Sequence, residues 1–133
     1  MNNVIAYLDT STVHAGRIGE LRPAMAELAA FVEANEPRII LYSVYFTPDE
    51  STMSVLHVHP DIASLELHLK VAGPKFPPIA PFITMETIEI FGHPTPDVTA
   101  QLVAKAKLLG HGTVIVRELH AGFARTLQNL AGT

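Results

Sequence analysis

Hydrophobic residues along this chain switch between a two-residue and a 3.6-residue period, and the order of these segments restricts the possible folds. Val4–Ser11 has the pattern of a strand and is followed by a helical segment. Two extended segments come next, Ile39–Phe46 and Met53–His59, and then a second helical segment and a strand at Ile83–Phe91. This β-α-β-β-α-β order predicts an α+β, ferredoxin-like domain whose helices cover one face of an antiparallel sheet.

The two helical segments have identifiable inner faces and ends. Apolar residues recur at three- and four-residue steps in the first, at Ile18, Leu21, Met25, Leu28 and Val32. Pro23 lies within this segment, so we expect a late start or a kink there. The second helix should begin after Asp61 as N-cap and end near Ala72, because Gly73 and a proline follow.

The chain continues beyond the ferredoxin-like unit with a further helix and strand. Thr95 and Pro96 have the chemistry of an N-cap and a first helical residue, and Gly110 should end that helix. Thr113–Arg117 should form a short strand, and weak helical character appears around Phe123–Leu130. We therefore divide the chain into a ferredoxin-like domain, residues 1–94, and an extension, residues 95–133, packed on the same domain.

Composition indicates one small domain with excess apolar surface. The 133 residues are 48% hydrophobic and only 17% charged, with a formal charge of −4. Ile39–Phe46 is almost continuously apolar, as in strands buried on both faces. Because two helices cover only one face of the sheet, we expect a homodimer in which a second copy covers the other, closing a dimeric α/β barrel.

Several protein classes are disfavoured by the same composition. The nine Lys and Arg residues are scattered, so no basic stripe is expected to bind nucleic acid. The absence of cysteine excludes disulfides and thiolate metal sites. The first residues lack a basic signal-peptide region, and no apolar run approaches the roughly 18 residues that span a bilayer. We expect a cytoplasmic protein without membrane contact.

Four short motifs resemble the antibiotic biosynthesis monooxygenase (ABM) domain over about residues 1–92. They are Glu36-Pro37, Leu41-Tyr42-Ser43-Val44-Tyr45, Pro60-Asp61 and Leu67-His68. The resemblance implies a homodimer with a pocket between helices and sheet. It also implies, by similarity to some members, oxidation of a small phenolic or quinol-like molecule by O2 without a cofactor.

Two departures from the family pattern weigh against a copied active site. The family's second histidine is absent, because Lys75-Phe76 occupies that stretch. The tryptophan of oxygenating and haem-degrading relatives is missing too, since the chain has no Trp. The sequence therefore leaves two functions open: a cofactor-independent monooxygenase, or a non-catalytic dimer that binds a small ligand or a protein partner.

His68 and His59 are the candidate catalytic residues. His68 borders the inward face of the second helix, where its imidazole could remove a proton from a phenolic substrate. His57 and His59 lie two apart on a strand and share one face, about 6.5 to 7 Å apart at Cα, a spacing that also allows metal chelation. A third ligand would have to come from His68 or Glu66. We expect no metal, with His57 lining the pocket.

Aromatic residues are the remaining candidates for substrate binding. Tyr42 and Tyr45 point to opposite faces of their strand, so one should face the helices and the other the dimer side. Phe76 and Phe82 flank a proline-rich segment, Lys75–Pro81, which we expect to be a loop that acts as a lid or as part of the dimer contact. Each of these aromatic side chains could instead only fill core volume.

Overall fold

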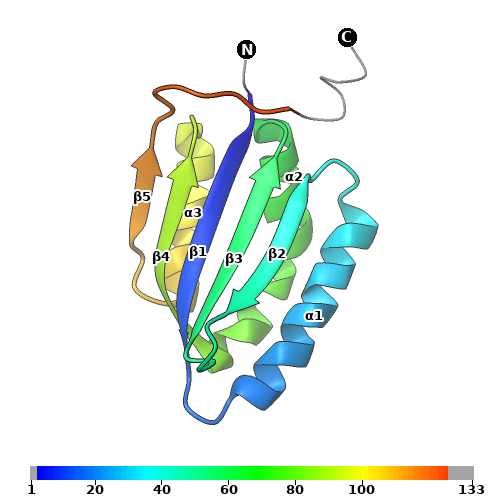
Figure 1. Cartoon of the computed structure of the whole chain (residues 1–133), viewed down its shortest axis with the longest axis vertical. Helices are drawn as coiled ribbons and strands as arrows, with labels where there is room; N and C mark the ends of the chain where they lie inside the picture. Colours follow the sequence, from blue (N-terminus) through cyan, green and yellow to red (C-terminus); the bar gives the residue numbers. More distant parts are fainter. Residues whose placement is uncertain (1–2, 126–133) are drawn as a thin grey trace.

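The computed structural model describes residues 3–125. Most of the expected helix around residues 123–130 lies outside this range, and the part within it is not helical. The elements, shown in Figure 1, are β1 (Ile5–Val13), α1 (Ile18–Asn35), β2 (Leu41–Phe46), β3 (Thr52–His59), α2 (Ile62–Ala72), two 3-10 helices η1 (Gly73–Lys75) and η2 (Pro77–Phe82), β4 (Ile83–Phe91), α3 (Pro96–Leu109) and β5 (Val114–Arg117).

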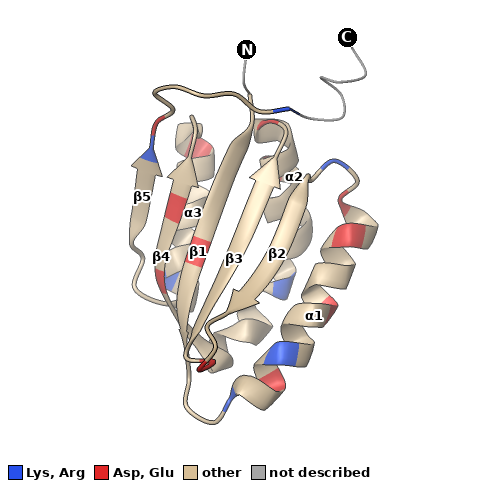
Figure 2. Ribbon diagram, viewed as in Figure 1, with Lys and Arg blue, Asp and Glu red and all other residues tan. Residues whose placement is uncertain are grey.

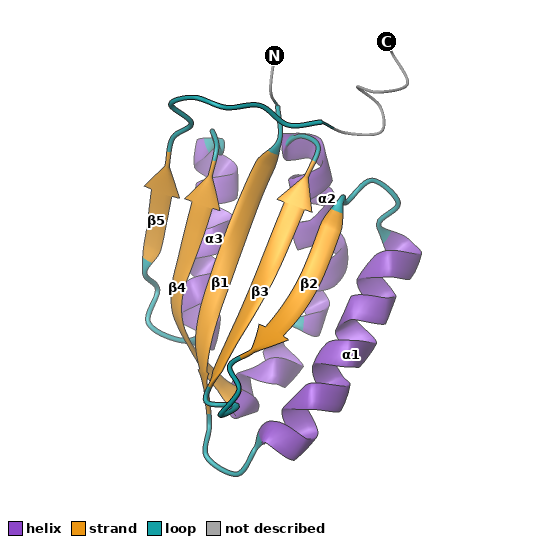
Figure 3. Ribbon diagram, viewed as in Figure 1, coloured by secondary structure: helices purple, strands orange, loops and turns teal. Residues whose placement is uncertain are grey.

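One five-stranded sheet runs through the molecule in the order β2-β3-β1-β4-β5. The first four strands pair antiparallel, and β5 joins β4 in parallel. Helices α1, α2 and α3 lie on the same side of this sheet (Figure 3). The α+β, ferredoxin-like prediction is confirmed, and the extension adds one helix and one edge strand to it.

The face of the sheet under the helices is not uniformly apolar. Alternation along β1 buries Ile5, Tyr7, Asp9 and Ser11 on this face. On the neighbouring strand β3 it buries Met53, Val55, His57 and His59. The register pairs Tyr7 with His57, so polar and aromatic groups of two adjacent strands meet in the core. This placement creates the candidate site.

Three local expectations differ from the structure. Helix α1 begins at Ile18 and continues through Pro23, so the late start is wrong: the proline lies near the helix start, and only the exposed Gly19 carbonyl loses a partner. Residues 73–82 form two 3-10 helices and not an irregular loop. β2 is a half-buried edge strand in the single chain, with Tyr45 54% exposed.

The extension is held to the core by its caps and by its buried side chains. The Thr95 side chain accepts a hydrogen bond from the Val98 amide at 3.1 Å, so the predicted N-cap is confirmed. Gly110 follows the helix and forms a β-bridge to Met85. The inward residues of α3 are Val98, Leu102, Lys105, Ala106 and Leu109. Lys105 is the unexpected member of this set.

Charged residues lie on the helices, on the loops and on β1, β4 and β5, whereas β2 and β3 carry none (Figure 2). Within residues 3–125 no helix is long and apolar enough to cross a membrane.

Candidate acid–base site

A narrow cavity lies between the sheet and the helices. Its volume is about 20 Å³, close to the space of one water molecule. Asp9, Tyr42 and Lys105 are its polar lining residues. The others are apolar and include three flexible methionines: Met25, Leu28, Met53, Val55, Phe76, Ile79, Ile83, Met85 and Leu109. A ligand larger than water must therefore displace some of these side chains.

Asp9 is the carboxylate at the polar end of this cavity. It is only 2% exposed, because its position in β1 points toward the helices. Its Oδ2 accepts hydrogen bonds from His57 Nε2 at 3.0 Å and Lys105 Nζ at 3.3 Å. Burial alone would raise the pKa of Asp9, but the Lys105 charge and the His57 hydrogen bond outweigh it and lower the pKa. Asp9 is therefore ionised at neutral pH.

His57 is neutral although it contacts a carboxylate. Burial holds its pKa well below the ordinary value, against the opposing effect of the hydrogen bond with Asp9. A neutral imidazole that donates Nε2–H to Asp9 has an unprotonated Nδ1, and this buried atom has no hydrogen-bond partner among the described residues. The Tyr7 ring stacks on His57 with centroids 3.8 Å apart, which fixes the ring plane.

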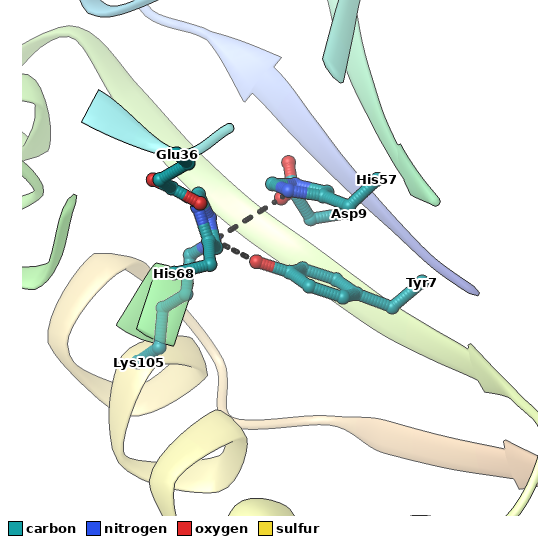
Figure 4. A network of polar contacts seen from close by, with 6 residues as sticks. All are labelled: Tyr7, Asp9, Glu36, His57, His68 and Lys105. Atoms are coloured by element: carbon teal, nitrogen blue, oxygen red, sulfur yellow. Dashed lines mark hydrogen bonds and ion pairs between the residues drawn. The ribbon is translucent and has the colours of Figure 1, made fainter. Parts of the chain in front are cut away.

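His68 and Glu36 form a second histidine–carboxylate pair (Figure 4). Nδ1 of His68 lies 2.9 Å from each Glu36 oxygen, and both side chains are buried. Burial lowers the pKa of His68 and outweighs the hydrogen bond with Glu36, so the imidazole is neutral. With its proton on Nδ1, His68 has a lone pair on Nε2, and no described residue uses it.

His59 completes a cluster of three buried histidines. Its Nδ1 lies 2.8 Å from Ser64 Oγ, and its Nε2 has no described partner. Burial, with a smaller effect of His68, lowers its pKa to about 3. The His68 ring lies 5.0 Å from the His57 ring and 5.6 Å from the His59 ring, centroid to centroid. The cluster can accept protons but holds none in excess at neutral pH.

The structure brings together some of the predicted site residues and separates others. Tyr42 and Phe76 line the cavity, and their rings lie 5.7 and 6.0 Å from His68. Tyr45 is on the opposite face of the sheet, as the register requires, and does not contact the cavity. Phe82 packs under the Arg17 guanidinium, 4.9 Å from its ring centre, and is not part of the lining.

The histidines are not arranged as a metal centre. His57 and His59 share a face as predicted, but residues 3–125 contain no group of three or more His, Cys, Asp or Glu side chains placed to bind one ion. Glu66, the alternative third ligand, is exposed on the outer side of α2. His57 and His68 each bind a carboxylate through one nitrogen instead.

Sequence reasoning missed Asp9, Glu36 and Lys105. Two of them had a detectable signal: Asp9 occupies an inward position of β1, and Lys105 lies three residues after Leu102 on the inward face of α3. A charged residue at such a position marks either an error in the assigned period or a buried ionic contact. Glu36 had no such signal, because it follows the end of α1.

Comparison with known proteins gives structural matches only. No protein-family model and no curated protein matches the chain. MupZ from Pseudomonas fluorescens aligns with a TM-score of 0.72 and 14% identity over 93% of this chain and 96% of its own. SnoaB from Streptomyces nogalater, a cofactor-independent oxygenase, aligns with a TM-score of 0.58 and 20% identity over 70% of this chain and 95% of its own. The chain has the ABM fold.

A third match is a candidate ABM protein from Caulobacter crescentus, with a TM-score of 0.57 and 25% identity over 67% of this chain and 88% of its own. The SnoaB and Caulobacter matches leave about a third of this chain unaligned, roughly the length of the extension. The MupZ match covers nearly the whole chain and so includes the extension.

Proposed function

We propose that the protein is an acid–base enzyme that removes a proton from a small, largely apolar molecule, with O2 as the oxidant of the resulting anion. The observation that carries the proposal is the buried His68–Glu36 pair, which leaves the Nε2 lone pair of His68 unused. The His68 ring lies next to the rings of Tyr42 and Phe76, which line the cavity. The likeness to SnoaB, a cofactor-independent oxygenase, supports O2 as co-substrate at the level of fold alone.

His68 is the base in this proposal. Glu36 holds the imidazole with its proton on Nδ1 and would stabilise the imidazolium formed when Nε2 takes a proton. The lowered pKa of His68 keeps the base unprotonated at neutral pH. Tyr42 and Phe76 line the cavity and lie next to His68, which does not line it, so side chains there must move for a substrate to reach the base.

The substrate class follows from the cavity lining. Nine of the twelve lining residues are apolar, which suits an aromatic body, and the polar ones lie on β1, β2 and α3. With a phenol as substrate, deprotonation gives an electron-rich phenolate. Oxidation by O2 would then add one oxygen atom to a ring carbon as a carbonyl and release the other as water. The product is a quinone, which has two hydrogens fewer than the phenol.

Oxygen uptake tests this function directly. The probes are small naphthols and hydroquinones, compared for the wild type, His68→Gln and Glu36→Gln. We expect His68→Gln to lower kcat/KM by about 10²- to 10⁴-fold, the range for loss of a general base. Glu36→Gln should lower it less, because an amide oxygen still accepts the Nδ1 hydrogen bond but cannot stabilise the imidazolium.

The matched control is His111→Gln, an exposed histidine that contacts Glu86 at 3.5 Å. Its oxygen uptake should equal that of the wild type. Unchanged uptake in His68→Gln would remove His68 from the mechanism. Enzyme-dependent exchange of a ring C–H hydrogen for deuterium under argon, without oxygen uptake in air, would keep the base and reject the oxidation.

One observation favours the alternative of a non-catalytic ligand-binding protein. The cavity holds about one water molecule, so the site as it stands is closed to any aromatic substrate. A probe that binds with neither hydrogen exchange nor oxygen uptake would establish this alternative.

A further inference from the structure

The extension, residues 95–133, contributes a buried cationic side chain, that of Lys105, to the cavity lining. Lys105 is on the inward face of α3 and only 7% exposed, and it lines the cavity at its polar end. Its Nζ lies 3.3 Å from Asp9 Oδ2 and 3.3 Å from the Tyr7 hydroxyl oxygen. Figure 4 shows Lys105 together with these two partners. The same nitrogen lies 4.3 Å from the centre of the Phe76 ring. A buried lysine at this position must form compensating contacts, and these contacts fix its direction.

The hydrogen-bond donors at this end of the cavity are not all used. A lysine ammonium has three N–H donors, and two of them reach Asp9 and Tyr7. Tyr7 accepts the second bond, so its own hydroxyl proton has no acceptor among the described residues. Asp9 is the only described carboxylate that contacts Lys105. One N–H of Lys105 and the O–H of Tyr7 therefore remain unused, with their nitrogen and oxygen 3.3 Å apart. Of these two residues, Lys105 lines the cavity and Tyr7 is buried next to it.

We propose that Lys105, assisted by the Tyr7 hydroxyl, binds a negatively polarised oxygen of the ligand. This arrangement suits a phenolate or an enolate, so the ligand class is a small, largely apolar phenol or ketone. In an apolar cavity a fixed cation and a hydroxyl donor stabilise such an oxygen far more than water-exposed groups do. The inference deepens the proposed function, because the anion that Lys105 binds is the one that His68 would produce.

The same observations predict which ABM-fold proteins lack this feature. Lys105 belongs to the extension, which the alignments with SnoaB and the Caulobacter protein are too short to include together with residues 1–94. The cation is thus an addition to the ferredoxin-like domain. The Lys105 ammonium would pair with an oxyanion of the ligand. Apolar residues at the same place would leave that oxyanion without a partner.

Binding of 4-nitrophenol tests the inference, because its absorbance distinguishes the anion from the neutral phenol. The wild type should bind the anion and lower the apparent pKa of the bound probe. Lys105→Met should weaken binding of the anion about 10- to 100-fold, the effect of one charge-assisted hydrogen bond, and leave affinity for the neutral phenol unchanged. Lys107→Met, an exposed lysine on the same helix, is the control and should bind like the wild type.

Removing Lys105 alone leaves Asp9 buried without its cation, which endangers folding. The double variant Asp9→Asn/Lys105→Met removes both charges and keeps a similar volume. It should fold and bind only the neutral phenol. Binding of the anion by this variant with wild-type affinity would overturn the inference, as would a wild type that binds the neutral phenol only or neither form.

The outcome is separable from that of the proposed function. Anion binding through Lys105 with no oxygen uptake or hydrogen exchange would preserve the oxyanion site and reject catalysis. Oxygen uptake that depends on His68 but not on Lys105 would do the reverse.

Discussion

At the scale of single residues, the protein places ionisable groups where core residues are expected. Asp9, Lys105 and three histidines are buried among apolar side chains. Each has compensating contacts, yet one ring nitrogen of each histidine lacks a hydrogen-bond partner among the described residues. These atoms are Nδ1 of His57 and Nε2 of His59 and His68. Buried polar atoms without partners destabilise a fold by about 1 to 3 kcal/mol each. Such positions are typical of functional sites, where stability is sacrificed for reactivity.

The buried histidines make stability sensitive to acid. Their pKa values in the folded protein lie below 6.5, that of His59 at about 3, because burial opposes the charged form. Between about pH 6.5 and the lowered values, the unfolded chain binds protons that the folded chain does not, so stability falls as pH falls. Each such histidine reduces the folding equilibrium constant up to about tenfold per pH unit.

Thermal unfolding at a series of pH values measures this effect. The melting temperature should be nearly constant from about pH 7 to 8 and fall steadily from pH 6.5 to 4. His59→Gln should flatten the slope, whereas His111→Gln, an exposed substitution, should not. A melting temperature independent of pH across that range would contradict the assigned protonation states.

Prediction from sequence succeeds for a residue's orientation and fails for its partner. The two-residue period placed His57 and His59 on one inward face, and the helical period placed His68 beside them. No period indicates that Glu36, 32 positions before His68, bonds to it, because that contact depends on how α1 and α2 pack. The same limit hid the contact between Lys105 and Asp9, 96 positions apart.

At the scale of elements, the extension depends on a close approach between Gly110 and β4. The chain after α3 passes so near Met85 that a Cβ atom at position 110 would overlap the Met85 backbone. This contact sets the end of α3 and the parallel pairing of β5. The sequence predicted Gly110 as a helix stop, but only the sheet packing shows why a side chain cannot replace its hydrogen.

Gly110→Ala should destabilise the protein by about 2 kcal/mol or more, because the backbone of one of the two segments must shift. Gly19→Ala is the matched substitution. A Cβ there meets no atom within 4 Å, and the residue lies in the exposed first turns of α1. We therefore expect this substitution to raise the free energy of unfolding by about 0.5 to 1 kcal/mol. Chemical denaturation of both variants gives the two values, and equal effects would refute the close-approach argument.

The elements that differ from expectation do so for local physical reasons. The proline-rich segment 73–82 forms 3-10 turns because prolines at their first positions fit the required φ and carry no amide hydrogen to satisfy. The apolar β2 is at the sheet edge, where a single chain leaves Tyr45 exposed. Composition predicted this apolar surface, and the second copy expected to cover it stays a prediction.

At the scale of the whole molecule, the face of the sheet opposite the helices is uncovered by the described chain (Figure 3). Its residues on the four ferredoxin-like strands include Leu8, Leu41, Tyr45, Leu56 and Val58. We propose that a second copy packs on this face. Native mass spectrometry should show a dimer for the wild type and a monomer for Leu56→Asp.

Leu67→Asp is the control for this experiment, because Leu67 is partly exposed on the outer side of α2, away from the sheet face. It should remain dimeric. A monomeric wild type would contradict the dimer proposal without affecting the site, since every residue in the site comes from one chain.

The proposed function depends most on His68 being a neutral base whose Nε2 is free. Long-range proton–nitrogen NMR of the imidazole rings at pH 7, with His68→Gln to assign the signals, measures this directly. We expect a neutral His68 with its proton on Nδ1, held by Glu36. A protonated His68, or a neutral ring with its proton on Nε2, could not accept a proton from a substrate and would contradict the proposed function.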